Sequence, residues 1–407
     1  MNAGGRISVS NGRPLVELLF FDAGGGHRAS AMALKSVSEQ QRRHWQIRLV
    51  NLRELLEPTD FIRRLTGIKA EDFYNWLLRH GLTSIVNPML PLMHMLIRRM
   101  HASHVQILTE YWRNSSPDLV VSMVPHFNRA IFEGLRGGDR AARRPDTPMA
   151  TILTDFADYS PHFWIERQEQ YFFCGTDVAA RQVVAAGNGA DQVLRTSGMI
   201  VRPEFYSPPK LRRADERIRL GLSPYLPTGL VMFGGYGSRR MTSIAQRVAE
   251  AGLRTQLIFM CGHNQALRER LLAMNLPFPH HIAGFTREIP WFMRLSDYFI
   301  GKPGPGSLSE ALVMKLPVIV ERNASTMMQE RYNTQWVSDN EVGIVLTSFS
   351  DIADGIKTML DASQHATFRF NIGSIENRAV FEIPAMLESL MSPAYADGDL
   401  NALHARA

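Results

Sequence analysis

Short apolar runs rich in β-branched and aromatic residues recur along the chain, and each ends at glycine, aspartate or proline before a helical pattern begins. Apolar strands that alternate with helices are typical of parallel sheets covered on both faces. The pattern therefore predicts an α/β fold and favours a doubly wound one. The runs are LVELLFFDAGGG, PDLVVSMVP, MATILTD and YFFCGT in one series, and GLVMFGG, TQLIFMCG, DYFIGKPGPG and LPVIVE in a second.

A stretch rich in proline and charge, PEFYSPPKLRRADER, separates the two series of strands. Such composition marks the linkers between domains. The second series ends near residue 360. A last helical stretch around 374–391 is expected to pack back on either domain, with the N-terminal domain as the candidate. The predicted division is an N-terminal domain at 1–205, a linker at 206–217, a C-terminal domain at 218–375 and a C-terminal helix and tail at 376–407.

Composition supports an ordinary folded protein of two domains. The 407 residues are 45% hydrophobic and 21% charged, which is unlike disordered or fibrous chains. The two cysteines, Cys174 and Cys261, are far apart and each adjoins an apolar run, so neither a disulfide framework nor a cysteine metal site is expected. A reducing cytoplasm fits this usage.

One segment departs from the strand–helix pattern. Residues 82–101, LTSIVNPMLPLMHMLIRRMH, form a Met- and Leu-rich stretch broken by two prolines and followed by arginines. The segment is too short and too broken by its prolines to span a bilayer, and the N-terminus lacks the apolar core of a signal peptide, so we expect neither spanning nor export. The segment suits an interfacial helix, and an ordinary buried helix is the alternative.

The net charge of +6 and the pI near 9.4 permit binding to nucleic acid, anionic lipid or phosphorylated substrates. Arginine pairs recur early, at Arg42–Arg43, Arg63–Arg64 and Arg98–Arg99, either as a lipid-facing patch or as solvated helix faces. No basic run with interleaved aromatic residues occurs, so nucleic-acid binding is not expected.

Glycine-rich loops follow three of the predicted strands, in FFDAGGGHRASA at 20–31, MFGGYGSRRM at 232–241 and GKPGPGSLSEAL at 301–312. Glycines at a strand–helix junction let backbone N–H groups approach an anion, although such turns also use glycine for geometry alone. Neither a Walker loop nor GxGxxG is present. In the third loop a helix is expected to begin near Ser307, with Glu310 either completing a capping box or reaching a ligand such as a ribose.

Several other side chains are candidates for ligand contacts. His126 and His263 follow predicted strands, where α/β proteins bind ligands, and a structural role is as probable for each. His280 and His281 are expected in a loop. Trp164 is a candidate lipid contact or a half-buried aromatic residue. Asp155 and Asp158 lack companions at metal-ligand spacing, so no metal is predicted.

Three runs carry a family resemblance: GGGHRASA (24–31), GFTREIPWFMRLSDYFIGKPGPGSLSEAL (284–312) and MMQERYN (327–333). They resemble the monogalactosyldiacylglycerol synthase and processive diacylglycerol glucosyltransferase group, relatives of the peptidoglycan N-acetylglucosaminyltransferase. The likeness extends from about residue 14 to residue 347. The resemblance implies a GT-B fold, in which two Rossmann-like domains with parallel sheets face each other across a cleft.

The resemblance also implies residue roles. His27 would be the general base, with Asp155 to orient it, and the activity would be inverting transfer of galactose or glucose from a UDP-sugar to diacylglycerol. The implied acceptor contacts are Gly25, Gly26, His126 and Trp164, and the implied donor contacts are Gly234, Gly235, Gly237, His263, Phe285, Gly304, Gly306, Ser307, Glu310, Gln329, Glu330 and Asn333.

The expected setting is the cytosolic face of an anionic membrane, bound peripherally through residues 82–101 and the arginine pairs, with no cofactor besides the UDP-sugar co-substrate. Two other classes remain open at this point. One is a UDP-sugar transferase with another acceptor, or a GT-B-like UDP-sugar epimerase. The other is a non-catalytic UDP-sugar-binding protein.

Overall fold

The computed structural model describes residues 12–22, 26–59, 83–159, 163–207 and 212–391, which group into two compact units. The first unit holds the described residues up to 200 and residues 378–391. Residues 83–88, at the start of one helix, are not part of it. The second holds those 83–88 residues and 201–377. Each unit contains one six-stranded sheet in which every pairing is parallel, so the predicted α/β fold is confirmed.

The first sheet has the strand order β2-β1-β3-β4-β5-β6. The apolar run around Leu18 forms β1, which lies between the edge strand β2 and β3, with Leu18 opposite Leu49 of β2 and Val121 of β3. The chain order reverses between β1 and β3, which is the topological switch point where open α/β sheets bind ligands. The strands are β1 (Leu15–Phe20), β2 (Gln46–Asn51), β3 (Leu119–Ser122), β4 (Met149–Ile152), β5 (Tyr171–Cys174) and β6 (Val193–Arg195).

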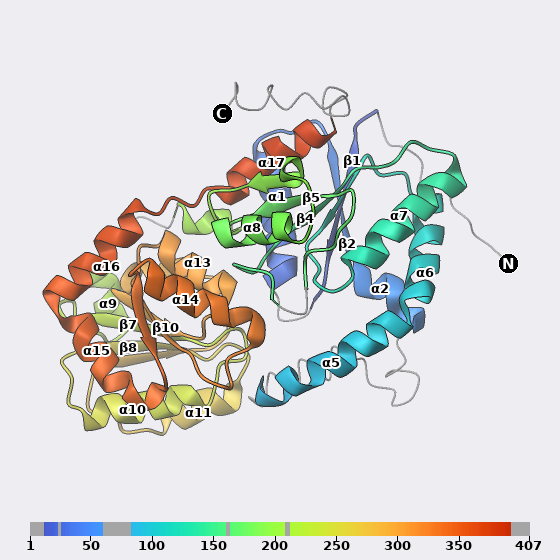
Figure 1. Ribbon diagram of the computed structural model, residues 1–407. Coiled ribbons are helices and arrows are strands. Elements are labelled where there is room, and N and C mark those ends of the chain that lie inside the picture. Colours follow the sequence, from blue (N-terminus) through green and yellow to red (C-terminus); the bar gives the residue numbers. More distant parts are fainter. Residues whose placement is uncertain (1–11, 23–25, 60–82, 160–162, 208–211, 392–407) are drawn as a thin grey trace. The chain divides into compact units, whose positions relative to one another are not determined.

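Helices cover the first sheet, and the C-terminal helix α17 lies beside α1 (Figure 1). Gln41 donates a hydrogen bond of 2.9 Å to the Phe381 carbonyl oxygen, and Arg43 pairs with Glu388. Residues more than 300 positions apart in sequence therefore share one unit. The helices are α1 (Gly26–Gln40), α2 (Leu52–Leu56), α5 (Thr83–Arg99), α6 (His101–Asn114), α7 (Asn128–Ala142), α8 (Asp177–Ala185) and α17 (Ala379–Leu390).

A buried carboxylate ties β1 to α6. Glu17 is fully buried and accepts hydrogen bonds from Tyr111, Trp112 and Ser115 at 2.7–3.0 Å, besides an ion pair of 2.9 Å with Arg48. A buried charge is tolerated when it is paired and its remaining lone pairs accept hydrogen bonds. The network thus fixes α6 against the sheet.

The second sheet has the order β12-β11-β10-β7-β8-β9, and its switch point lies between β7 and β10. Its strands are β7 (Thr228–Met232), β8 (Gln256–Met260), β9 (His280–Ala283), β10 (Tyr298–Gly301), β11 (Val318–Glu321) and β12 (Gly343–Leu346). The helices of this unit are α9 (Arg213–Arg219), α10 (Arg240–Glu250), α11 (Gln265–Leu272), α12 (Ile289–Leu295), α13 (Pro305–Val313), α14 (Arg331–Asp339), α15 (Ile352–Leu360) and α16 (Ala362–Ser374).

The histidine pair at the start of β9 corrects one expectation. His280 and His281 open this edge strand, with His280 opposite Leu257 of β8, so their assignment to a loop is wrong. Both side chains are half-buried, because β9 is an edge strand and has a neighbouring strand on one side only. The pattern of a fully apolar run, which identifies central strands, is therefore absent there.

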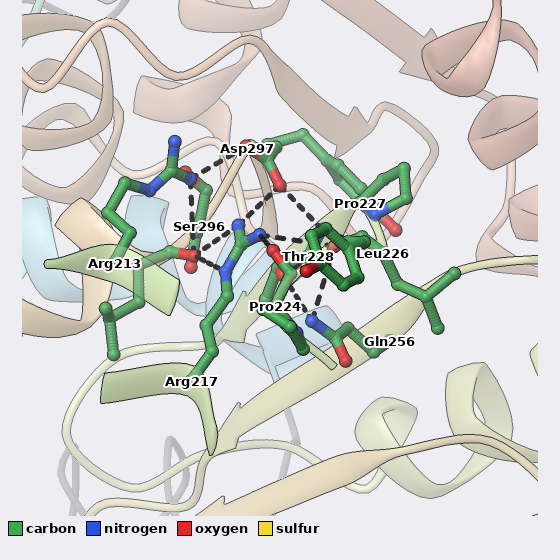
Figure 2. Close-up of polar contacts among 12 residues, drawn as sticks. Arg213, Arg217, Pro224, Leu226, Pro227, Thr228, Gln256, Ser296 and Asp297 are labelled. Carbon is green, nitrogen blue, oxygen red and sulfur yellow. Dashed lines mark hydrogen bonds and ion pairs between the residues drawn. The ribbon is translucent and has the colours of Figure 1, made fainter. Parts of the chain in front are cut away.

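A polar network at the amino ends of β7 and β10 holds α9 against the second sheet (Figure 2). The Asp297 carboxylate lies 2.7 Å from both Arg213 and Arg217 and accepts a hydrogen bond from the Thr228 backbone N–H. These charges and this hydrogen bond hold the pKa of Asp297 below its ordinary value against the effect of burial. Gln256 extends the network through its bond of 2.8 Å to the Thr228 hydroxyl.

We predict that Asp297→Ala destabilises the second unit by about 3 kcal/mol, because the variant leaves the Arg217 guanidinium buried without its countercharge. Urea unfolding of the full chain measures the loss. The matched control is Glu216→Ala, which breaks the exposed pair with Arg219 and should cost less than about 1 kcal/mol. Equal losses in the two variants would show that the network adds nothing to stability.

Candidate functional site

The predicted acceptor-side residues gather at the carboxyl ends of β1, β3 and β4. His27 lies in the first turn of α1, which begins at Gly26 directly after the β1 loop. His126 follows β3, and Thr154 and Asp155 follow β4. Because these strands are parallel neighbours, their carboxyl ends meet at one edge of the sheet. Gly25 lies outside the described residues.

The structure keeps His27 neutral. Its Nδ1 atom lies 3.2 Å from the Thr154 hydroxyl, and its ring centroid is 5.9 Å from that of Trp164. Burial lowers the pKa of His27 to about 4, and a hydrogen bond with the Met123 backbone acts in the opposite direction. At neutral pH the ring therefore carries one proton and one lone pair.

His126 is held in an unusual conformation beside this ring. Its φ of 70° is positive, which is uncommon for a residue with a side chain. Its ring lies 4.2 Å from that of Phe163, and its Nδ1 is 2.9 Å from Nε2 of His94 on α5. Burial, then the nearby His94 and His27, lower the pKa of His126 to about 3.

The two aspartates of this region have different partners. Asp155 accepts a hydrogen bond of 2.9 Å from Nε1 of Trp164, whose side chain is only 1% exposed. Asp158 accepts three backbone hydrogen bonds, from the N–H groups of residues 163, 164 and 165. Asp158 thereby positions the loop that carries Trp164. The described part of the chain contains no group of three or more potential metal ligands.

In the second unit, the predicted donor-side glycines follow β7. Gly234 and Gly237 have φ values of 79° and 59°, and the Gly237 N–H donates to the Gly234 carbonyl at 3.2 Å, so both are required by this tight turn. Gly235 differs, because the space where a Cβ would lie is open. Its carbonyl accepts a hydrogen bond of 2.8 Å from the His263 backbone.

The side chains of His263 and Phe285 form a stacked pair. Their ring centroids are 3.8 Å apart with an interplanar angle of 19°. Phe285 is 57% exposed, although large apolar side chains are usually buried. The structure thus brings together two donor candidates from the loops after β8 and β9.

The loop after β10 corrects the expected start of its helix. Helix α13 begins at Pro305, with Gly304 at the N-cap and no side-chain cap, so Ser307 neither starts the helix nor forms a capping box with Glu310. Proline is favoured at the first helical position because it has no N–H to satisfy. Ser307 instead donates a bond of 3.4 Å to the Gly304 carbonyl, and the space beside Gly306 is open.

Glu310 faces one cation. Nη2 of Arg202 lies 3.3 Å from its Oε1. Burial raises the pKa of Glu310 to about 7, while Arg202 lowers it and Glu204 adds to the rise. Near neutral pH the carboxyl group is therefore present in both its charged and its neutral form. A hydrogen-bond donor that stabilises the carboxylate will lower the pKa and increase the charged fraction.

One of the remaining donor candidates, Glu330, contacts Lys302, the residue after β10. Its ammonium lies 2.9 Å from Oε1 of Glu330, which is 5% exposed. Asn333 donates a bond of 2.7 Å to the Pro303 carbonyl, while its own buried Oδ1 has no hydrogen-bond partner among the residues that the structure describes. Gln329, in the short helix η4 (Met328–Glu330), lies 4.0 Å from the Met327 sulfur.

Comparisons with known proteins show which sequences and folds this chain is similar to. No protein family model matches the chain. Monogalactosyldiacylglycerol synthase from Spinacia oleracea is 29% identical over 360 residues, which are 83% of this chain and 64% of the spinach protein. The chain is similar in sequence to the monogalactosyldiacylglycerol synthases. It spans less than two thirds of the length of the spinach synthase.

Solved structures confirm the GT-B fold of this synthase-like chain. MurG from Acinetobacter baumannii aligns with a TM-score of 0.55 at 12% identity, over 93% of this chain and 99% of MurG. A putative UDP-N-acetylglucosamine 2-epimerase from Listeria monocytogenes aligns with a TM-score of 0.58 at 15% identity, over 96% of this chain and 98% of the epimerase. At such identities the likeness concerns the fold alone.

Four side chains at the two sheet edges of the synthase-like chain were not predicted from sequence. Thr154 contacts His27, His94 contacts His126, Arg202 contacts Glu310 and Lys302 contacts Glu330. Lys302 has a sequence signal, since it directly follows a predicted strand at the start of the glycine-rich loop GKPGPG. Thr154 lies at the end of the predicted strand run MATILTD, His94 lies in the segment 82–101, and Arg202 directly precedes the proline-rich stretch, but nothing in these stretches indicates the partner of each side chain.

We predict that the synthase-like chain loses stability in mild acid. His104 is 5% exposed with an unpartnered Nδ1, and burial lowers its pKa to about 4. The unfolded chain, with an ordinary histidine pKa near 6.5, binds the proton first, so about 3 kcal/mol is lost as pH falls from 6.5 to 4. His27 and His126 act in the same direction.

Urea unfolding between pH 7.5 and 4.5 measures this slope. His104→Gln should flatten it, whereas His44→Gln, at an exposed position, should leave it unchanged. A slope that His104→Gln does not alter would contradict the assignment.

Proposed function

We propose that this protein is an inverting glycosyltransferase that moves galactose or glucose from a UDP-sugar to diacylglycerol at the cytosolic face of a membrane. The acceptor oxygen attacks the anomeric carbon, the bond to the diphosphate breaks, and UDP leaves with the electron pair. The observation that carries the proposal is the neutral His27 at the switch point of the first unit, in a chain similar to galactolipid synthases.

The acceptor hydroxyl must lose its proton to a base, and His27 is proposed for this role. With a pKa of about 4 its lone pair is available throughout the neutral range, but it accepts a proton only weakly. A nearby carboxylate would stabilise the imidazolium as it forms, and we propose Asp155, which adjoins Thr154 in the same loop. The switch-point position of Gly26 and His126 supports their assignment as acceptor contacts.

Features of the second unit support UDP-sugar binding. The N-termini of α10 and α13 follow the adjacent strands β7 and β10, and both lack a side-chain cap. Arg239 and Arg240 stand at the start of α10, and Arg240 pairs there with the buried carboxylate of Glu321 at the end of β11. We propose that these groups and Lys302 offset the charge on the leaving diphosphate without a metal.

Other donor groups are assigned by chemistry. Glu310 would accept hydrogen bonds from the ribose hydroxyls, as acidic residues do in nucleotide-binding folds. The exposed face of Phe285, stacked on His263, suits a flat base. Glu330, Gln329 and Asn333, whose Oδ1 lacks a partner, would bind the sugar hydroxyls.

Helix α5 supports contact with lipid. It runs unbroken from Thr83 to Arg99, and Leu92 and Met95 expose 52% and 57% of their surface, with arginines at its C-terminal end. No helix in the described part of the chain is long and apolar enough to cross a membrane. We propose that α5 lies in the interface with its arginines at the headgroups. Arg63 and Arg64 lie outside the described residues.

A product assay tests the function. The full chain is incubated with diacylglycerol in anionic vesicles and with UDP-galactose, UDP-glucose or UDP-N-acetylglucosamine in turn, and the lipids are analysed by mass spectrometry. We expect a hexosyl-diacylglycerol. His27→Ala should lower kcat by about 10²–10⁴-fold with UDP affinity nearly unchanged, because only the proton transfer is lost.

Glu310→Ala is the matched variant in the donor-side unit. It should weaken UDP binding by about 1–3 kcal/mol, because the ribose hydroxyls lose their acceptor. Release of UDP without any lipid product would point to another acceptor. UDP binding without turnover, unaffected by His27→Ala, would favour a non-catalytic protein.

Vesicle flotation tests the membrane assignment. The double variant Leu92→Ser/Met95→Ser should bind anionic vesicles at least about tenfold more weakly, because two exposed apolar side chains no longer enter the bilayer. Phe370→Ser, which removes an apolar side chain that is 79% exposed on α16, is the control and should bind normally. Equal binding by both variants would exclude α5 as the contact.

A further inference from the structure

The contact between His94 and His126 connects α5 to the acceptor edge of the first sheet. Nε2 of His94 and Nδ1 of His126 are 2.9 Å apart, and the ring centroids are 4.8 Å apart. The Phe163 ring lies against both, at 5.5 Å from His94 and 4.2 Å from His126. A half-buried side chain of the proposed interfacial helix therefore holds a ring that lies at the same edge of the sheet as the proposed base.

Both rings are neutral at physiological pH. Burial lowers the pKa of His126 to about 3, and burial and the nearby Arg98 lower that of His94. A hydrogen bond between two neutral imidazoles needs an N–H on one ring and a lone pair on the other. Either His94 donates from Nε2, or His126 donates from Nδ1.

The intrinsic preference of histidine decides between the two arrangements. The neutral side chain is more stable with its proton on Nε2 than on Nδ1. When His94 donates from Nε2, His126 accepts at Nδ1, so both rings carry their proton on the preferred Nε2. When His126 donates from Nδ1, both rings carry their proton on Nδ1. The hydrogen bond that one ring nitrogen makes determines where the other proton resides. His126 accordingly uses its Nδ1 lone pair and carries its proton on Nε2.

The backbone restrains His126 as well. Its φ of 70° is a strained conformation, and its N–H donates to the Phe163 carbonyl at 2.5 Å. Strained residues persist where their surroundings hold them, and they cluster at functional sites. The ring of His126 is thus restrained by its backbone, by Phe163 and by His94.

We propose that His94 is a positioning residue that keeps His126 in its Nε2–H tautomer, so that His126 offers an N–H donor to the acceptor oxygen beside His27. The identity of the acceptor and the role of His27 as the base rest on the proposed function. A donor beside the base holds the hydroxyl oxygen in place while its proton passes to His27. Because Leu92 and Met95 flank His94 on α5, the same helix would contact lipid and orient the donor.

The tautomer is measured directly by long-range ¹H–¹⁵N correlation NMR on full-length protein labelled with ¹⁵N-histidine, at pH 7. The signals of His126 are assigned with His126→Gln. We expect a protonated Nε2 and an unprotonated Nδ1 in the wild type and in His94→Gln, whose amide still donates. His94→Leu should give a mixture of the two tautomers.

The matched control is His101→Leu on the neighbouring helix α6, which breaks the contact of His101 with Glu133 and should leave His126 unchanged. An Nδ1-protonated His126 in the wild type would overturn the inference. An unchanged tautomer in a folded His94→Leu variant would do the same. Thermal unfolding checks that each variant is folded.

Transfer kinetics provide the second readout. His94→Leu should lower kcat about tenfold or more through misplacement of the acceptor, with KM for the UDP-sugar unchanged, and His94→Gln should recover most of the rate. If the wild type transfers no hexose to diacylglycerol but the tautomer responds to His94→Leu, the proposed function fails and the tautomer assignment stands. Full activity in His94→Leu would overturn the positioning role.

Discussion

Parallel pairing throughout both sheets is the constraint on which the rest of the molecule depends. Every strand of a sheet ends on the same edge, and where the strand order reverses, the two helices leave toward opposite faces and open space between their loops. In the first unit this places His126 beside His27. In the second it brings Gly234 close to Lys302, whose Cε lies 3.9 Å from where a Cβ on Gly234 would be.

Desolvation acts on ionisable groups everywhere in the molecule, and the number of partners decides its outcome. Asp297 has two guanidinium groups and a backbone N–H, and its pKa stays low despite burial. Glu310 has Arg202 as its main countercharge, and burial raises its pKa to about 7. The switch-point histidine His27 is kept neutral in the same way. The structural carboxylate Asp297 thus has enough partners to stay charged. Glu310 and His27 in the candidate site have fewer partners, so burial shifts their pKa values toward the neutral form.

The central strands of both sheets could be predicted from sequence because they are buried on both faces. The runs in β1, β3, β4 and β5, and in β7, β8, β10 and β11, are almost entirely buried and mostly apolar, with single exceptions such as Glu17 in β1. The four strands not predicted, β2, β6, β9 and β12, are the edge strands. Their residues are mostly half-buried, so neither a continuous apolar run nor a strict alternation marks them. The histidines of β9 are an example, because a polar edge strand has the same residue types as a loop.

The positions of the candidate site followed from local sequence, but its pairings did not. Glycines directly after a predicted strand mark the loop at its carboxyl end. This signal correctly placed His27, Glu310 and the glycine loops after the carboxyl ends of their strands. Thr154 lies 127 residues from His27, and Arg202 lies 108 residues from Glu310. Such pairs are set by which strands are neighbours, and no periodicity encodes that order. Even the local Ser-x-x-Glu pattern misled, because Pro305 begins α13 earlier. Residue type and loop position therefore predict which ionisable and hydrogen-bonding groups lie at the site. The order of the strands in the sheet decides which of these groups contact each other.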